Sequence, residues 1–163
     1  MHSIDIRDVS VLIVDKNPLL RTVFRQVLRE LGASDVATAS NVENGFAAFQ
    51  ANNPDVVLAD WGPGCDGLEL LDQMRNDPAS VNPFVPVVIT SAYTEAEAVI
   101  SARDMGMSGF LAKPVSAETL YTRIARVLSE SRSFVRSGAF FGPDRRYQES
   151  EATLGDRRQS NAA

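Results

Sequence analysis

The stretch Val56-Val57-Leu58-Ala59-Asp60 is an uninterrupted apolar run that ends in a carboxylate. Three further runs also end in a polar residue: Val9 to Val14 at Asp15, Val87 to Thr90 at Ser91, and Gly109 to Ala112 at Lys113. Continuous apolar runs are typical of parallel strands that are buried on both faces. Because α/β sheets hold their ligands where parallel strands end, we expect these four polar residues to meet at one edge.

Helical patterns separate the apolar runs. With a further short run at Val36 to Ala39, the chain alternates strand and helix five times up to about residue 130. This alternation predicts an α/β fold with a doubly wound, five-stranded parallel sheet and five helices on both faces. Right-handed crossovers leave few topologies, and the flavodoxin-like strand order 2-1-3-4-5 is the commonest.

Several helix starts can be predicted from capping residues. Asn17 precedes Pro18 and is expected to cap the first helix, and Ser116 is expected to open the last one. Two pairs have capping-box spacing and are expected to open the second and fourth helices: Ser40 with Glu43, and Thr94 with Glu97.

The composition changes at about residue 131. Residues 131–163 contain six arginines and four acidic residues, whereas the whole chain has a net charge of -5. We therefore expect one domain over residues 1–130 and an Arg-containing C-terminal tail over residues 131–163 that is extended or partly disordered. The arginine pairs of this tail belong either to a solvated arm or to a site for an anionic nucleotide or an acidic partner.

Composition excludes several classes of function. An acidic chain lacks the basic footprint of a general nucleic-acid binder. His2 is the only histidine and Cys65 the only cysteine, which excludes Ser-His-Asp catalysis, a histidine-rich zinc site and an internal disulfide. No apolar run approaches the roughly 20 residues of a membrane span, so a cytoplasmic location is expected.

The polar strand ends suggest phosphoryl chemistry. A carboxylate such as Asp60 can accept a phosphoryl group as an acyl phosphate, which adds negative charge that must be neutralised. Lys113 can supply an ammonium and Ser91 a hydroxyl donor. Alone, Asp60 could equally be a polar residue that ends a strand before a turn.

The chain resembles the receiver domain of two-component response regulators over about residues 8–130. Four segments carry the resemblance: Val11 to Asp15, Asp60 to Leu71, Ser91-Ala92, and Gly109 to Pro114. The tail from Phe134 to Arg146 is similar to an extension of single-domain alphaproteobacterial receivers, with its Gly-Pro-Asp-Arg-Arg motif.

The resemblance implies a role for several residues. Asp60 would be the phosphoacceptor, Ser91 the switch hydroxyl, and Lys113 the lysine that contacts the phosphoryl group. Phe110 matches the aromatic switch position of the family, and the Pro114 that follows Lys113 is often cis there. The implied catalysis is limited to self-phosphorylation and self-dephosphorylation at Asp60.

The implied metal site contains one departure from the family pattern. Receivers hold Mg²⁺ with two adjacent acids and the phosphoacceptor, here Asp15, Asp60 and the backbone carbonyl of Gly62. Lys16 replaces the second acid, which removes an oxygen ligand and repels a dication. Either Lys16 points to solvent and leaves a weakened site, or its ammonium lies between the two carboxylates in place of the metal.

The implied function is phosphorelay signalling by a stand-alone receiver. A histidine kinase or phosphotransfer protein would phosphorylate Asp60, and the output would be contact with an unknown downstream protein, since no DNA-binding domain or membrane segment is encoded. Such a protein would be a monomer, or a homodimer through its fourth helix, fifth strand and fifth helix. A pseudo-receiver that signals without phosphorylation is the alternative that Lys16 suggests.

Two enzyme classes fit less well. Aspartate-nucleophile phosphatases carry Asp-x-Asp after the nucleophile strand, and neither Asp15-Lys16-Asn17 nor Asp60-Trp61-Gly62 has this pattern. The string Gly62-Pro63-Gly64-Cys65-Asp66-Gly67 matches a dinucleotide-binding motif. However, Asp60 would repel a pyrophosphate and Pro63 lacks an amide donor.

Overall fold

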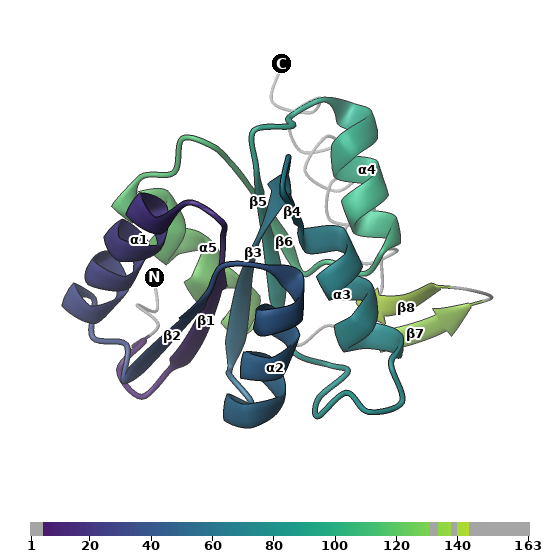
Figure 1. Cartoon of the computed structure of the whole chain (residues 1–163), viewed down its shortest axis with the longest axis horizontal. Helices are drawn as coiled ribbons and strands as arrows, with labels where there is room; N and C mark the ends of the chain where they lie inside the picture. The colour runs from purple at the N-terminus through teal and green to yellow at the C-terminus, as the bar shows by residue number, and fades with distance from the viewer. Residues whose placement is uncertain (1–4, 131–133, 138–139, 144–163) are drawn as a thin grey trace, which may run out of the picture.

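Five strands of a parallel sheet organise the computed structural model, which describes residues 5–130, 134–137 and 140–143 (Figure 1). The strands, in spatial order, are β2 (Asp35–Ala39), β1 (Ser10–Val14), β3 (Val56–Gly62), β5 (Val87–Ser91) and β6 (Gly109–Ala112). All four pairings between neighbours are parallel. The predicted order 2-1-3-4-5 is confirmed, because the short strand β4 (Cys65–Asp66) only pairs back on the end of β3.

Helices cover both faces of the sheet (Figure 1). Their bounds are α1 (Pro18–Glu30), α2 (Val42–Asn52), α3 (Gly67–Asn76), α4 (Ala96–Asp104) and α5 (Ala117–Ser129). Buried residues of α1 and α5 share one core cluster, and those of α2, α3 and α4 share the other. The sheet therefore lies between two apolar layers, as a doubly wound α/β fold requires.

The central strand β3 is buried on both faces. Val56 to Ala59 are at most 1% exposed, with Val56 and Leu58 in one core cluster and Val57 and Ala59 in the other. Burying one side chain of this size stabilises the fold by about 1.5–3 kcal/mol. This packing on two sides fixes the direction of β3 and so fixes where Asp60 lies at its end.

Two predicted helix starts are confirmed. The Asn17 side chain accepts hydrogen bonds from the backbone N–H groups of Leu19 and Leu20. Ser116 caps α5 through a reciprocal capping box with Thr119.

Two other predicted capping boxes are wrong. Asn41, not Ser40, caps α2, because its side chain accepts from the backbone N–H of Asn44. The helix α4 begins after Glu95, and no side chain caps it, so Thr94 is not its N-cap.

The described part of the predicted tail forms a β-hairpin. Strands β7 (Phe134–Ser137) and β8 (Phe140–Pro143) pair antiparallel, and β8 packs on α3 (Figure 1). The ring of Phe141 packs edge-on against that of Phe84, with centroids 5.6 Å apart. Residues 140–143 of the predicted tail therefore pack on the domain, and residues 144–163, most of the part predicted to be extended or partly disordered, lie outside the described residues.

Glycines and a buried arginine shape the surface under the hairpin. A Cβ added at Gly142 would lie 2.6 Å from the Cα of Gly106, so the two backbones approach too closely for any larger residue. Beside them the buried guanidinium of Arg75 donates to the carbonyls of Gly106 at 3.1 Å, Pro83 at 3.0 Å and Val85 at 2.7 Å. These bonds tie α3 to the turn that the hairpin covers, at the end of the sheet opposite to Asp60.

Candidate functional site

The predicted meeting of strand ends occurs at the carboxyl edge of the sheet. Asp15 follows β1, Asp60 lies in β3, Ser91 ends β5 and Lys113 follows β6. A cavity of about 240 Å³ opens there, and its lining includes Asp15, Lys16, Asp60, Gly62 and Lys113. The chemistry of the site therefore depends on how these charged groups are arranged.

One ammonium joins the two carboxylates. The Nζ of Lys113 lies 2.7 Å from Oδ1 of Asp60 and 3.1 Å from Oδ2 of Asp15. The three side chains are 20%, 9% and 3% exposed, respectively. Charges buried to this degree require partners, and here two carboxylates share one. The peptide bond from Lys113 to Pro114 is cis, as the resemblance implied.

Burial and pairing act in opposite directions on these groups. Burial raises the pKa of Asp60, and the hydrogen bond and charge of Lys113 only partly offset this. Burial also disfavours the charged form of Lys113, but its hydrogen bonds to Asp60 and Asp15 raise its pKa overall. The site thus holds an ionised lysine against a carboxylate that is less easily ionised than usual.

The hydroxyl of Ser91 is hydrogen-bonded to two backbone groups. Its Oγ donates to the Trp61 carbonyl at 2.7 Å and accepts from the Tyr93 N–H at 2.9 Å. Ser91 therefore lies at the expected strand end but is not hydrogen-bonded to Asp60. Donation to a group on Asp60 would require the Ser91–Trp61 bond to break.

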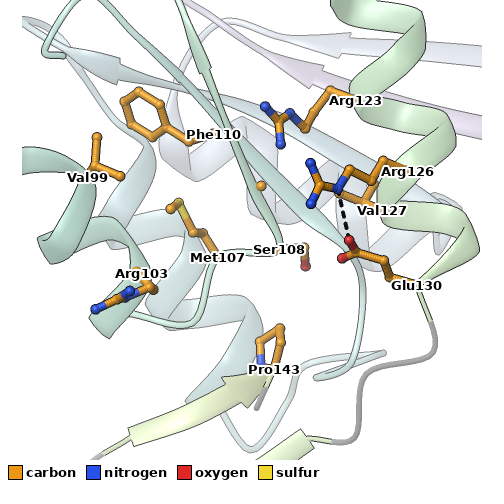
Figure 2. Close-up of a pocket in the computed structure, with 11 residues that line it drawn as sticks. Val99, Arg103, Met107, Ser108, Phe110, Arg123, Arg126, Val127, Glu130 and Pro143 are labelled. Atoms are coloured by element: carbon orange, nitrogen blue, oxygen red, sulfur yellow. Dashed lines mark hydrogen bonds and ion pairs between the residues drawn. The ribbon is translucent and has the colours of Figure 1, made fainter. Parts of the chain in front are cut away.

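Phe110 lies away from the carboxylates. It is half-buried on β6 and lines a separate cavity with Val99 of α4 (Figure 2). The structure thus places the predicted switch aromatic between β6 and α4, and does not bring it to the acidic site.

Lys16 lies over the turn after β3. Its side chain is exposed, and its Nζ is 2.8 Å from where a Cβ of Gly64 would be. Among the described residues, no ion pair of Lys16 occurs, and the ammonium between Asp15 and Asp60 belongs to Lys113. The hypothesis that Lys16 lies between the two carboxylates is therefore wrong, whereas the solvent-exposed alternative agrees with its position.

The glycines of the Gly62 to Gly67 string serve the turn. Gly64 has φ +83°, a conformation that side chains other than glycine rarely adopt. A Cβ at Gly67 would lie 2.5 Å from the Asp60 carbonyl oxygen, so α3 can begin against this strand only with glycine there. These backbone requirements account for Gly64 and Gly67 in the motif without a nucleotide.

Sequence reasoning missed the groups that hold Asp15. Its backbone carbonyl accepts from Nη1 of Arg21 at 2.7 Å, and its Oδ1 accepts from the Asn17 N–H at 2.9 Å. The position of Arg21 one turn into α1 was the available signal. The Asn17 bond holds one oxygen of the Asp15 carboxylate, and the other oxygen contacts Lys113.

The donor set departs from an ordinary receiver magnesium site at Lys16. A hard dication needs oxygen ligands, and this edge offers the carboxylates of Asp15 and Asp60 with the Gly62 carbonyl nearby. Lys16 occupies the position of a further acid, and Lys113 already contacts both carboxylates. Across the described part of the chain, no group of three or more His, Cys, Asp or Glu side chains is arranged to hold a metal ion.

Known proteins resemble this chain in sequence and fold. The family model of the response regulator receiver domain matches residues 11–125. The chemotaxis protein CheY of Pseudomonas aeruginosa is 28% identical over 120 residues, which cover 73% of this chain and 95% of that protein. The chemotaxis protein CheY-3 of Vibrio cholerae is 28% identical over 128 residues, which cover 78% of this chain and 97% of that protein.

Solved structures of response regulators have a similar fold. Chemotaxis protein CheY4 of Vibrio cholerae superposes with a TM-score of 0.68 at 27% identity, covering 74% of this chain and 98% of that one. A response regulator described as putative from Chloroflexus aurantiacus gives the same TM-score and identity, and the match covers 76% of this chain and 100% of that one. In the described ranges no helix has the length and apolar character to cross a membrane. With most of its length matched by the family model, the chain belongs to the response regulator receiver domain family.

Proposed function

We propose that this chain is a receiver whose Asp60 accepts a phosphoryl group from a histidine kinase or phosphotransfer protein in the cytoplasm. The observation that carries the proposal is the pair formed by Asp60 and Lys113 at the end of β3, where Nζ and Oδ1 are 2.7 Å apart. The pair combines a buried nucleophile with a cation that can neutralise the charge of an acyl phosphate.

The chemical step is a displacement at phosphorus. An Asp60 carboxylate oxygen forms the new bond to phosphorus while the bond to the donor's imidazole nitrogen breaks, and the electron pair leaves with the imidazole. The Lys113 ammonium stays beside the equatorial oxygens and neutralises part of the added charge. The raised pKa of Asp60 favours attack, because a more basic carboxylate is the stronger nucleophile.

The response to phosphorylation would begin at Ser91. Three acceptor oxygens on Asp60 would compete with the Trp61 carbonyl for the Ser91 hydroxyl, which now donates at 2.7 Å. Movement of Ser91 pulls on the loop between β5 and α4 and allows Phe110 to change position. The output is protein contact by the face made of α4, β6 and α5, with a target protein or with a second copy.

Phosphorylation can be tested with acetyl phosphate as donor. We expect a covalent mass increase of one phosphoryl group in the native chain and none in Asp60→Asn. An unmodified wild type under conditions that phosphorylate a known receiver would refute the proposal. Multiple turnover of a generic aryl phosphate would instead favour the aspartate-nucleophile phosphatases.

Lys16 supports a second candidate, a pseudo-receiver with impaired Mg²⁺ binding that signals without phosphorylation. Its ammonium lines the same cavity as Asp60. Trp61 lies next to Asp60 and can report metal binding by fluorescence. We expect little quenching on Mg²⁺ addition in the wild type and restored quenching in Lys16→Asp.

The two candidates separate when both measurements are combined. Phosphorylation that is unaffected by a metal chelator supports a receiver that needs no Mg²⁺. Lack of phosphorylation in the wild type, with phosphorylation restored in Lys16→Asp, supports the pseudo-receiver. Strong Mg²⁺ quenching in the wild type would refute the impaired metal site.

A further inference from the structure

Lys16 is a cation of the acidic site that forms no ion pair with a described residue. The cavity at the carboxyl edge of the sheet is lined by two carboxylates and two ammonium groups, those of Asp15, Asp60, Lys16 and Lys113. Lys113 contacts both carboxylates, whereas the exposed side chain of Lys16 pairs with neither. The unphosphorylated site therefore contains a second cation that its own carboxylates do not use.

The backbone on both sides of Lys16 is fixed. The carbonyl of Asp15 accepts from Nη1 of Arg21 at 2.7 Å, and the backbone N–H of Asn17 donates to Oδ1 of Asp15 at 2.9 Å. The backbone N–H of Lys16 itself donates to the thiol of Cys65. Lys16 is thus held between the start of α1 and the turn after β3, so its side chain starts from a defined position.

The side chain of Lys16 follows the backbone of Gly64. A Cβ added at Gly64 would lie 2.9 Å from Cδ and 2.8 Å from Nζ of Lys16, so the lysine stem uses the space that a side chain at this position would take. The ammonium of Lys16 therefore reaches the cavity along the turn after β3. Lys113 reaches the same cavity from the end of β6.

One oxygen of Asp60 has room for a phosphoryl group. Lys113 contacts Oδ1, and Oδ2 forms no hydrogen bond or ion pair with a described residue. A Cβ added at Gly62 would have Oδ2 of Asp60 at 4.0 Å as its nearest described neighbour outside residues 61–63. A phosphoryl group on Oδ2 would therefore lie over Gly62, two residues before the glycine that the Lys16 side chain follows.

The phosphorylated site needs a further positive charge. A phosphoryl group carries roughly -2 at neutral pH, and the charge of Asp15 remains beside it. The ammonium of Lys113 neutralises only part of this excess. In the family pattern Mg²⁺ would contribute the rest, but Lys16 stands at the position of the second acid, and an ammonium there repels a dication.

The remaining lining of the cavity strengthens electrostatic interactions. It is mostly apolar or aromatic, with contributions from Leu20, Trp61, Pro63, Ala92 and Tyr93. The rings of Trp61 and Tyr93 pack edge-on, with centroids 5.5 Å apart. Apolar walls reduce the screening of charge by water. Burial raises the pKa of Asp60, and the charge of Lys16 is among the influences that oppose this rise, so the two groups already interact.

We propose that Lys16 is a phosphoryl-contacting residue, whose ammonium donates a hydrogen bond to an oxygen of the phosphoryl group on Asp60 and takes over the charge-neutralising role of a magnesium ion. Lys16 keeps its protons throughout, so it acts neither as an acid nor as a nucleophile. The inference rests on the proposed function, the phosphorylation of Asp60. It extends that function by making the transfer independent of a divalent metal.

The first test is phosphorylation of the full chain by acetyl phosphate, followed by intact mass in EDTA and in Mg²⁺. We expect the wild type to react at nearly the same rate in both. In EDTA, Lys16→Gln should be about tenfold slower, as loss of a charge-assisted hydrogen bond predicts, and Lys16→Arg should retain most of the rate. Lys16→Asp should react only with Mg²⁺.

Arg29→Gln is the matched control for these rates. Arg29 is an exposed arginine in the last turn of α1, and it does not line the acidic cavity. Its replacement removes one positive charge from the surface, as Lys16→Gln does. We expect the rate of Arg29→Gln in EDTA to equal that of the wild type.

The second test observes Lys16 directly by NMR. Lys16 and Lys113 are the only lysines of the chain, so selective ¹³C labelling of lysine gives two side-chain Cε signals, and Lys16→Gln identifies each. Phosphorylation in EDTA should shift the Lys16 signal. Asp60→Asn treated in the same way should show no shift.

The outcomes separate this inference from the proposed function. Modification only in Mg²⁺, equal rates of the wild type and Lys16→Gln in EDTA, or an unshifted Lys16 signal would each overturn the role of Lys16 and leave Asp60 as the phosphoacceptor. A wild type that is unmodified both in EDTA and in Mg²⁺ would refute the proposed function, and the role of Lys16 with it.

Discussion

Replacing Lys113 by Met should destabilise the fold in a way that depends on pH. In the wild type, one ammonium lies 2.7 Å from Asp60 and 3.1 Å from Asp15. Met has a similar shape but no charge, so the variant leaves two buried carboxylates facing each other. The change therefore tests whether Lys113 is the counterion of this site.

The magnitude follows from the geometry. Both carboxylate oxygens contact the same nitrogen, so they are no more than about 6 Å apart. At an effective dielectric constant of about 20, two like charges at this distance repel by roughly 3 kcal/mol. Removing one partner of a buried ion pair typically costs about 3–5 kcal/mol. Because a carboxyl can take up a proton instead, we expect a loss of about 2–3 kcal/mol at pH 8.

The pH dependence has a definite sign. Without Lys113, the folded-state pKa of Asp60 rises further above its ordinary value of 3.8. A carboxyl whose folded pKa is raised lowers stability as pH increases between its unfolded and folded pKa values. Urea unfolding of Lys113→Met should therefore show a smaller loss at pH 5 than at pH 8.

Lys16→Met is the matched control, because Lys16 is exposed and has no ion pair in the described ranges. We expect it to change the unfolding free energy by less than about 0.5 kcal/mol. Equal losses in the two variants, or a Lys113→Met loss that is the same at pH 5 and pH 8, would refute the counterion role.

Three further outcomes are expected. Cys65 is 3% exposed, and burial raises the pKa of its thiol to about 11. Iodoacetamide at pH 8 should therefore modify Cys65 only after the protein unfolds, and rapid labelling of the native protein would contradict this. Gly142→Ala should lower the free energy of unfolding by about 1–3 kcal/mol and increase hydrogen exchange in β8, because the added Cβ would collide with Gly106. Unchanged exchange would exclude that contact. Asp60→Asn should raise the midpoint of thermal unfolding at pH 8, because burial of the charged Asp60 carboxylate is unfavourable. This gain should disappear as pH falls below the raised pKa of Asp60. A lower midpoint at pH 8 would contradict the burial effect.

The sheet and the ends of its strands were predictable because their physical causes are local. An unbroken apolar run such as Val56 to Ala59 is buried on both faces, and parallel strands end at one edge. The short distance between Lys113 and Asp60 follows from this arrangement. The same reasoning placed Ser91 at the edge, but the direction of its hydroxyl depends on the Trp61 carbonyl, which belongs to another strand.

Other features depend on long-range contacts that no local pattern encodes. The hairpin packs through the close approach of Gly142 to Gly106 and the ring contact of Phe141 with Phe84, pairs far apart in the sequence. The position of Lys16 over Gly64 likewise depends on the path of the turn after β3. In both cases the sequence supplies the residue types, and the packed structure decides which of them meet.

The hairpin also determines how this protein can be attached to other objects. Pro143 lies beside the turn before β6, at the end of the sheet remote from Asp60. A fluorescent reporter or surface tether joined directly after Pro143 would leave the path of a phosphoryl donor to Asp60 open. The same attachment would crowd the cavity that Pro143 lines together with Arg103 and Arg123, whereas the carboxyl edge of the sheet would remain accessible in an immobilised chain.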